Sequence, residues 1–163
     1  MNAQIHQEDD TTLASYAQDL TNKPRILLVE DHHIIQKSTT LLLNELNCEV
    51  TLASCGKEAI DFFKDDFDLI LLDIGLPDME GYDVSKYIRE SDFPYSKKVP
   101  IIGHTAHNIS TVIERCCLSG MNTAYNKITS SDEFYEMLMK YLPKKFHSFL
   151  KKPNTNIVKT MKS

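Results

Sequence analysis

Short apolar runs alternate with helix-like segments through the middle of the chain. Continuous apolar runs at residues 26–29 and 69–72 are typical of strands buried on both faces, and weaker runs predict strands at 50–53, 99–102 and 121–127. Between and after these runs, apolar residues recur at intervals of three or four, which predicts five helices. This alternation favours an α/β fold, in which a parallel sheet lies between helices and the crossovers are right-handed.

The two ends of the chain differ from this middle part in charge. Residues 1–22 carry four acidic side chains and no Lys or Arg, whereas residues 143–163 carry six lysines and no acidic side chain. We therefore divide the chain into an acidic N-terminal extension at 1–23, which we expect to be partly disordered, a folded domain at 24–142, and a basic tail at 143–163. A short helix at residues 13–20 is compatible with the few apolar residues of the extension.

Several functional classes are disfavoured by the composition. No apolar run approaches the ~18 residues that a membrane-spanning helix needs, and the polar start lacks the apolar core of a secretory signal, so we expect a cytoplasmic protein. Residues 23–142 hold 12 basic and 19 acidic side chains, a net charge of −7, which argues against sequence-specific DNA binding. The cysteines follow no zinc-binding spacing and are expected to be small buried apolar residues: Cys48, Cys55, Cys116 and Cys117.

Polar residues follow the predicted strands at the points where the strands end. Glu30 and Asp31 follow the first strand, Asp73 follows the third, Thr105 follows the fourth, and Lys127 ends the fifth. In an open parallel sheet these positions meet at the carboxyl edge, where ligands bind. Clustered carboxylates favour a hard cation such as Mg²⁺, which also binds phosphate. An aspartate can act as a nucleophile toward phosphorus, and an ammonium group can offset charge on the phosphoryl oxygens.

Four segments carry a resemblance to a known family. They are ILLVED at residues 26–31, LLDIGLPDMEG at 71–81, PIIGHTAH at 100–107, and GMN at 120–122, seven residues ahead of Lys127. Together they resemble the response-regulator receiver domains of two-component signalling, and receivers of hybrid sensor kinases most of all. The resemblance implies a flavodoxin-like (βα)5 fold, a doubly wound sheet of five parallel strands in the order 2-1-3-4-5. It also suggests a stand-alone, single-domain response regulator.

The resemblance implies a role for each site residue. Asp73 would accept a phosphoryl group from a histidine kinase or a histidine phosphotransfer protein, and output would pass to an unknown downstream protein or along a phosphorelay. The protein would catalyse only its own phosphorylation and dephosphorylation and would not be an enzyme in the usual sense. Mg²⁺, or alternatively Mn²⁺, would be held by Glu30, Asp31, Asp73 and the backbone carbonyl of Gly75. Thr105 and Lys127 would bind the phosphoryl oxygens, and Gly75 and His107 are candidates for controlling phosphoryl lifetime.

Two positions depart from the family pattern. Receivers usually follow the lysine with proline, often through a cis bond, but Ile128 stands here; we expect a trans bond, because a cis bond before a non-proline costs about 2.5–4 kcal/mol. The usual switch aromatic, three residues before the lysine, is replaced by Ala124. The adjacent Tyr125 should point to the opposite face of its strand. These departures leave open a non-switching interaction module that keeps the fold but not the output.

A second alternative is a metal-dependent phosphoesterase, because Asp31, His32 and His33 form a motif seen in one such family. That family needs further acidic ligands and a longer chain, so the receiver interpretation is preferred. The two histidines are expected at the start of the first helix, near the rim of the site.

Overall fold

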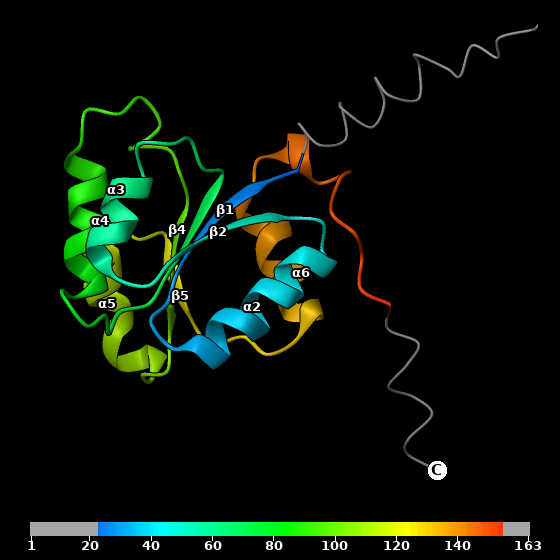
Figure 1. Cartoon of the computed structure of the whole chain (residues 1–163), viewed down its shortest axis with the longest axis horizontal. Helices are drawn as coiled ribbons and strands as arrows, with labels where there is room; N and C mark the ends of the chain where they lie inside the picture. The colour runs from blue at the N-terminus through cyan, green and yellow to red at the C-terminus, as the bar shows by residue number, and fades with distance from the viewer. Residues whose placement is uncertain (1–22, 155–163) are drawn as a thin grey trace, which may run out of the picture.

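The structure, a computed structural model, describes residues 23–154. Its centre is a parallel sheet of five strands in the order β2-β1-β3-β4-β5, as expected (Figure 1). The strand bounds are β1 Arg25–Val29, β2 Glu49–Ala53, β3 Leu69–Leu72, β4 Ile101–Thr105 and β5 Thr123–Asn126. Because all five strands run in the same direction, their carboxyl ends lie along one edge of the sheet.

Helices cover both faces of the sheet (Figure 1). One face is covered by α3 Gly56–Phe62, α4 Gly81–Glu90 and α5 Ile109–Leu118, and the other by α2 His33–Glu45 and α6 Ser131–Tyr141. A single 3-10 turn, η1 Lys144–Phe146, follows α6. Each face therefore has its own hydrophobic core, and the sheet separates the two.

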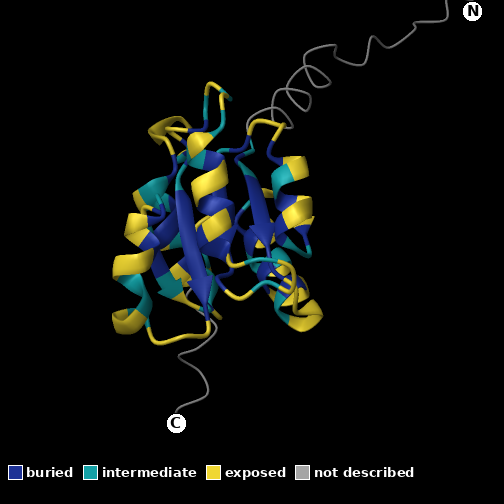
Figure 2. Cartoon of the chain, turned by 90° about the vertical axis from the view of Figure 1, so that its left-hand side faces the viewer, coloured by how far each residue is buried: buried dark blue, intermediate teal, exposed yellow. Residues whose placement is uncertain are grey.

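The strand residues alternate between these two cores. Leu27 and Val29 of β1 pack toward α3, α4 and α5, whereas Ile26 and Leu28 pack toward α2 and α6. All four side chains are buried, which explains why the sequence shows a continuous apolar run rather than an alternating one (Figure 2). Burial on both faces also fixes the register, because a shift by one residue would exchange the two sets of side chains.

Capping residues mark the starts of α5 and α6 and the end of α5. The side chain of Asn108 accepts a hydrogen bond from the backbone of Ser110 at the start of α5, and Ser130 accepts one from Glu133 at the start of α6. After α5 the chain reverses at Gly120, whose φ of 94° lies in the left-handed region that glycine tolerates best.

The packed body extends beyond the expected boundary at Leu142. Phe146 and Leu150 are buried in the core beneath α2 and α6. Two hydrogen bonds attach the same segment to the α2–β2 turn: the Asn47 side chain donates to the Phe149 carbonyl at 2.9 Å, and the Lys151 N–H donates to the carbonyl of Leu46. The first part of the basic segment is therefore part of the folded domain. Its buried apolar residues hold it there despite its lysines.

Other expectations have mixed outcomes. Cys48 and Cys116 are buried, but Cys55 is only partly buried and Cys117 is exposed, which corrects the expectation of four buried cysteines. No helix in residues 23–154 is long and apolar enough to cross a membrane. The expected helix at 13–20, most of the acidic extension and the end of the basic tail lie outside the described residues.

Candidate functional site

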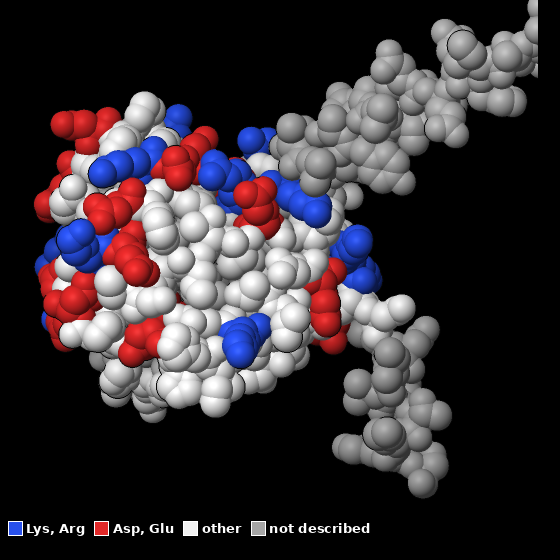
Figure 3. Space-filling model, in the orientation of Figure 1, with Lys and Arg blue, Asp and Glu red and all other residues white. Residues whose placement is uncertain are grey.

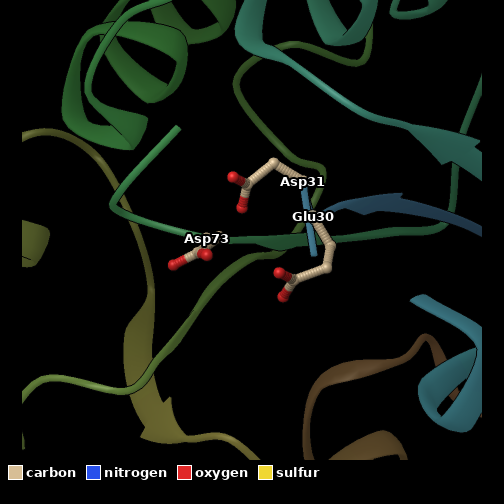
Figure 4. Close-up of side chains that lie close together, drawn as sticks. All are labelled: Glu30, Asp31 and Asp73. Atoms are coloured by element: carbon tan, nitrogen blue, oxygen red, sulfur yellow. The ribbon is translucent and has the colours of Figure 1, made fainter. Parts of the chain in front are cut away.

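Three carboxylates meet at the carboxyl edge of the sheet, as the sequence predicts (Figure 4). Glu30 and Asp31 follow β1, and Asp73 follows the adjacent central strand β3. Each offers one oxygen, and these three oxygens lie within 4.8 Å of one another. Glu30 is almost fully buried, with its Oε1 accepting a hydrogen bond from the His32 N–H at 3.1 Å, whereas Asp31 is open to solvent.

Lys127 brings a positive charge into this cluster from the end of β5. Its Nζ forms an ion pair with Glu30 and lies 3.0 Å from Oδ2 of Asp73. The Lys127 side chain is only 15% exposed, so these interactions take place largely out of solvent. Three carboxylates and one ammonium group leave two uncompensated negative charges, which a divalent cation would balance.

Thr105 lies at the end of β4, and its hydroxyl is held by a neighbouring histidine. The Oγ1 atom of Thr105 is 3.0 Å from Nδ1 of His107 and accepts a hydrogen bond from the His107 N–H at 3.1 Å. Thr105 is fully buried, while His107 is exposed. His107 is therefore in direct contact with the threonine hydroxyl, and its influence on phosphoryl lifetime stays a prediction.

The loop between β3 and α4 is held close to Asp73. The Gly75 N–H donates to Oδ1 of Asp73 at 3.3 Å, and Gly81 donates to the Ile74 carbonyl at 2.8 Å. A Cβ atom added to Gly81 would press on the Asp73 carbonyl oxygen and lie 2.9 Å from Cα of Ile74. Glycine at position 81 therefore lets the start of α4 approach the backbone of Asp73.

This close approach predicts that Gly81→Ala destabilises the protein and disturbs the site. We expect the free energy of unfolding to fall by about 1–3 kcal/mol, because the clash involves backbone atoms that cannot rotate away. The matched control is Gly75→Ala in the same loop, where an added Cβ meets nothing within 4 Å. Urea denaturation of both variants measures the difference; equal stabilities would mean that the backbone at Gly81 yields easily.

Side chains from this loop also anchor it to two helices. Both carboxylate oxygens of Asp78 accept backbone N–H groups at the start of α3, from Gly56 and Lys57, at 2.8 Å each. Desolvation tends to raise the pKa of Asp78, but these N–H donors outweigh it and hold the pKa below its usual range. Glu80 forms an ion pair with Arg115 of α5. The part of this loop that leads into α4 is thus attached to both α3 and α5.

The two departures from the family pattern have clear structural outcomes. Ala124 faces the core beneath α5, and Tyr125 packs on the opposite face, with its ring centroid 6.4 Å from that of Tyr141. The expectation that Ala124 and Tyr125 face opposite sides of the sheet is therefore confirmed. The peptide bond before Ile128 is trans, as expected, and there is no cis peptide bond in residues 23–154.

The histidines of the phosphoesterase motif are not part of the metal-binding group. His32 and His33 lie at the start of α2, as expected, and Nδ1 of His33 is 3.1 Å from the side-chain oxygen of Gln36. Within the described part of the chain, the one cluster suited to a metal consists of carboxylates alone. Oxygen donors of this kind fit a hard cation such as Mg²⁺.

Comparison with known proteins identifies the family. Residues 26–139 match the response regulator receiver domain. The chain belongs to this family. Among relatives of this receiver, probable histidine kinase 1 of Oryza sativa subsp. indica is 29% identical over 169 residues, which cover 85% of this chain and 18% of the relative. Hybrid signal transduction histidine kinase L of Dictyostelium discoideum is 33% identical over 122 residues, covering 72% of this chain and 7% of the kinase. The receiver thus spans less than a fifth of either kinase.

Solved structures give the same result. The receiver domain of a sensor histidine kinase from Pseudomonas aeruginosa, with magnesium coordinated in its active site cleft, is 32% identical with a TM-score of 0.67, covering 73% of this receiver and 97% of that chain. A receiver domain crystallised with the histidine phosphotransfer protein of Saccharomyces cerevisiae is 26% identical with a TM-score of 0.64, covering 74% and 89%. This chain is therefore a receiver domain of two-component signalling.

Sequence reasoning missed several contacts around the receiver site. The Asp78 cap on α3 and the ion pair between Glu80 and Arg115 join positions more than twenty residues apart, which hydrophobic periodicity does not relate. The bond from the Ile128 N–H to the buried His104 ring was also missed. A histidine within an otherwise apolar strand is the signal that could have drawn attention to it.

Proposed function

We propose that this receiver accepts a phosphoryl group on Asp73 in a Mg²⁺-dependent reaction. The observation that carries the proposal is the position of Asp73, which lies next to both Lys127 and the two other carboxylates at the end of the central strand. Glu30, Asp31 and Asp73 would hold the cation together with the Gly75 carbonyl. Mn²⁺ has the same preference for oxygen ligands, and its ability to replace Mg²⁺ here stays a prediction.

The proposed chemistry follows from these positions. A carboxylate oxygen of Asp73 forms a bond to phosphorus as the bond from phosphorus to the donor imidazole breaks. The imidazole keeps the electron pair of the broken bond on one nitrogen and, with a proton already on the other, leaves as a neutral ring. Bound Mg²⁺ would supply charge stabilisation of the phosphoryl oxygens. Lys127, held near both acids, offsets negative charge on the phosphoryl group, and the Thr105 hydroxyl would exchange its His107 partner for a phosphoryl oxygen. The receiver acts only on itself in this scheme and turns over no separate substrate.

The direct test uses a small-molecule donor. Incubation of the full chain with acetyl phosphate and Mg²⁺ should add one phosphoryl group, detected by intact-mass spectrometry, and EDTA should prevent it. Absence of labelling under conditions that label another receiver would contradict the proposal.

The natural donor is proposed to be a phosphohistidine on a kinase or a histidine phosphotransfer protein. Such a donor must approach the rim of the site, where α2 begins directly after Glu30 and Asp31. Ile34 and Leu41 of α2 are 73% and 64% exposed and lie seven residues apart, on one side of the helix. Figure 3 shows a largely uncharged surface over this helix. An apolar surface next to the acceptor is suited to bury a protein donor.

A charge placed on this surface should therefore slow phosphotransfer from a protein donor without slowing phosphorylation by a small molecule. We expect Leu41→Glu to slow phosphotransfer from the fastest donor in a screen of phosphorylated histidine phosphotransfer proteins by about tenfold or more. Labelling by acetyl phosphate should not change, because Leu41 lies about two helical turns after the start of α2 and is not among the carboxylates of the site. The control is Leu118→Glu, which places the same charge at a 78% exposed leucine on α5. Equal transfer rates for the two variants would remove α2 from the donor interface.

Output is proposed to pass through protein contacts, or along a phosphorelay, and not through sequence-specific DNA binding. The change on phosphorylation should be carried by Thr105, the following loop and α5, because Ala124 has no ring to swing. The non-switching alternative predicts phosphorylation without a change in partner affinity. The cytoplasmic location stays a prediction.

A further inference from the structure

A buried histidine on β4 supports the peptide that follows Lys127. The Nε2 atom of His104 accepts a hydrogen bond from the Ile128 N–H at 2.8 Å. His104 is 1% exposed and Ile128 6% exposed, so neither group has ready access to water. The ring lies among apolar side chains, with its centroid 5.8 Å from that of Phe134 on α6.

This bond extends the pairing between β4 and β5 past the end of the ladder. The ladder's final pairs join His104 to Tyr125 and Thr105 to Asn126. The Lys127 N–H then donates to the Thr105 carbonyl at 2.9 Å, and the Ile128 N–H donates to the His104 ring. Two successive N–H groups, one on each side of the Lys127 Cα, are therefore held by adjacent residues of β4.

The substitution of isoleucine for the family's usual proline explains why an acceptor is needed here. Proline has no N–H, whereas Ile128 places an N–H group in the protein interior. A buried N–H without a partner is costly. An apolar side chain at position 104 could not accept this bond, and the His104 ring does.

The tautomer of His104 follows from the same bond. Because Nε2 accepts, the proton of the neutral ring lies on Nδ1, which is buried and has no hydrogen-bond partner among residues 23–154. Burial, with the nearby positive charge of Lys127, lowers the pKa of His104 to about 3. The ring is therefore a neutral acceptor throughout the physiological range, and the bond to Ile128 is maintained there.

We propose that His104 is a positioning residue for Lys127: the hydrogen bond from the Ile128 N–H to the His104 ring fixes the peptide that follows Lys127. This inference rests on the proposed function, because it assigns Lys127 a task at the phosphoryl group. It implies that the acceptor at position 104 is needed only while the residue at position 128 has an N–H group.

The test is a cycle of His104→Leu, Ile128→Pro and the double variant. His104→Leu leaves the Ile128 N–H without an acceptor, so phosphorylation by acetyl phosphate should slow by about tenfold. Mg²⁺ affinity should stay within about twofold, because the carboxylates are untouched. In the double variant the N–H is gone, and the rate should recover most of the loss. This rescue, and the split between rate and Mg²⁺ affinity, would not accompany a purely structural role.

Ile102→Val is the control for general damage to the core. It shortens a buried side chain two residues earlier on the same strand, in the same core as Phe134, without touching the hydrogen bond. An equal loss of rate in Ile102→Val, or a double variant no faster than His104→Leu, would overturn the inference.

The hydrogen bond can also be observed without phosphorylation. In the ¹⁵N-labelled full chain, a scalar coupling between the Ile128 amide nitrogen and Nε2 of His104 should be measurable, and ring shifts should show the Nδ1–H tautomer between pH 5 and 8. An Nε2–H tautomer would disprove the contact even if Asp73 is phosphorylated. If the contact is present but the parent protein is never phosphorylated, the proposed function fails and the positioning role fails with it.

Discussion

Asp73→Asn will accept no phosphoryl group from acetyl phosphate and Mg²⁺. An amide is not a nucleophile toward phosphorus, whereas the carboxylate of Asp73 is one and lies beside both the ammonium group and the proposed metal ligands. The change keeps the shape of the side chain and its ability to accept the Gly75 N–H, so the fold should persist. Intact-mass spectrometry after incubation with the donor measures the result.

The control for this variant is Asp65→Asn, which makes the same change of charge at an exposed position between α3 and β3. It should be labelled at the rate of the parent protein. Labelling of Asp73→Asn at any comparable level would place the acceptor elsewhere, and peptide mapping of the labelled protein would then show where.

The second large effect is on metal binding. We expect Glu30→Gln combined with Asp31→Asn to weaken Mg²⁺ binding by at least about 100-fold, because two of the three side-chain oxygen ligands lose their charge. Phosphorylation by acetyl phosphate should be lost with it. Two opposing effects act on the stability of the double variant: repulsion among the acids is relieved, but the buried ion pair between Glu30 and Lys127 is lost.

Isothermal titration calorimetry with MgCl₂ measures the affinity, and circular dichroism shows whether the double variant is folded. The matched control is Asp83→Asn with Glu90→Gln, which removes the same two charges from exposed positions on α4. Unchanged Mg²⁺ affinity in the folded Glu30 and Asp31 double variant would show that the ligands have been assigned wrongly.

Hydrophobic pattern and family resemblance together predicted the fold and the members of the site. The run at Leu69–Leu72 predicts a strand buried on both faces, and the strand order implied by the resemblance places Asp73 at the centre of the carboxyl edge. The site residues follow strand ends, so the same order predicts that they share one edge of the sheet. The contacts of Lys127 with Glu30 and Asp73 are seen only in the structure.

What could not be predicted depends on side-chain direction and on weak local signals. Lysines dominate residues 143–163, which favours a charged tail, yet Phe146 and Leu150, four residues apart, pack in the core, so the first part of this segment belongs to the folded body. The choice of His107 as partner of the Thr105 hydroxyl depends on rotamers that residue spacing does not determine. Contacts of this kind follow from three-dimensional packing and not from periodicity.

The division of the core by the sheet has a consequence for how partner choice can evolve. The buried side of α2, opposite the surface proposed to receive the donor, packs in one core, and α5, proposed to carry the response, packs in the other (Figure 1). An exposed substitution on α2 that adapts it to a new donor therefore makes no direct contact with the cluster that holds α5. If both proposed roles are right, donor choice and output can change separately after gene duplication, while the proposed chemistry at Asp73 is kept.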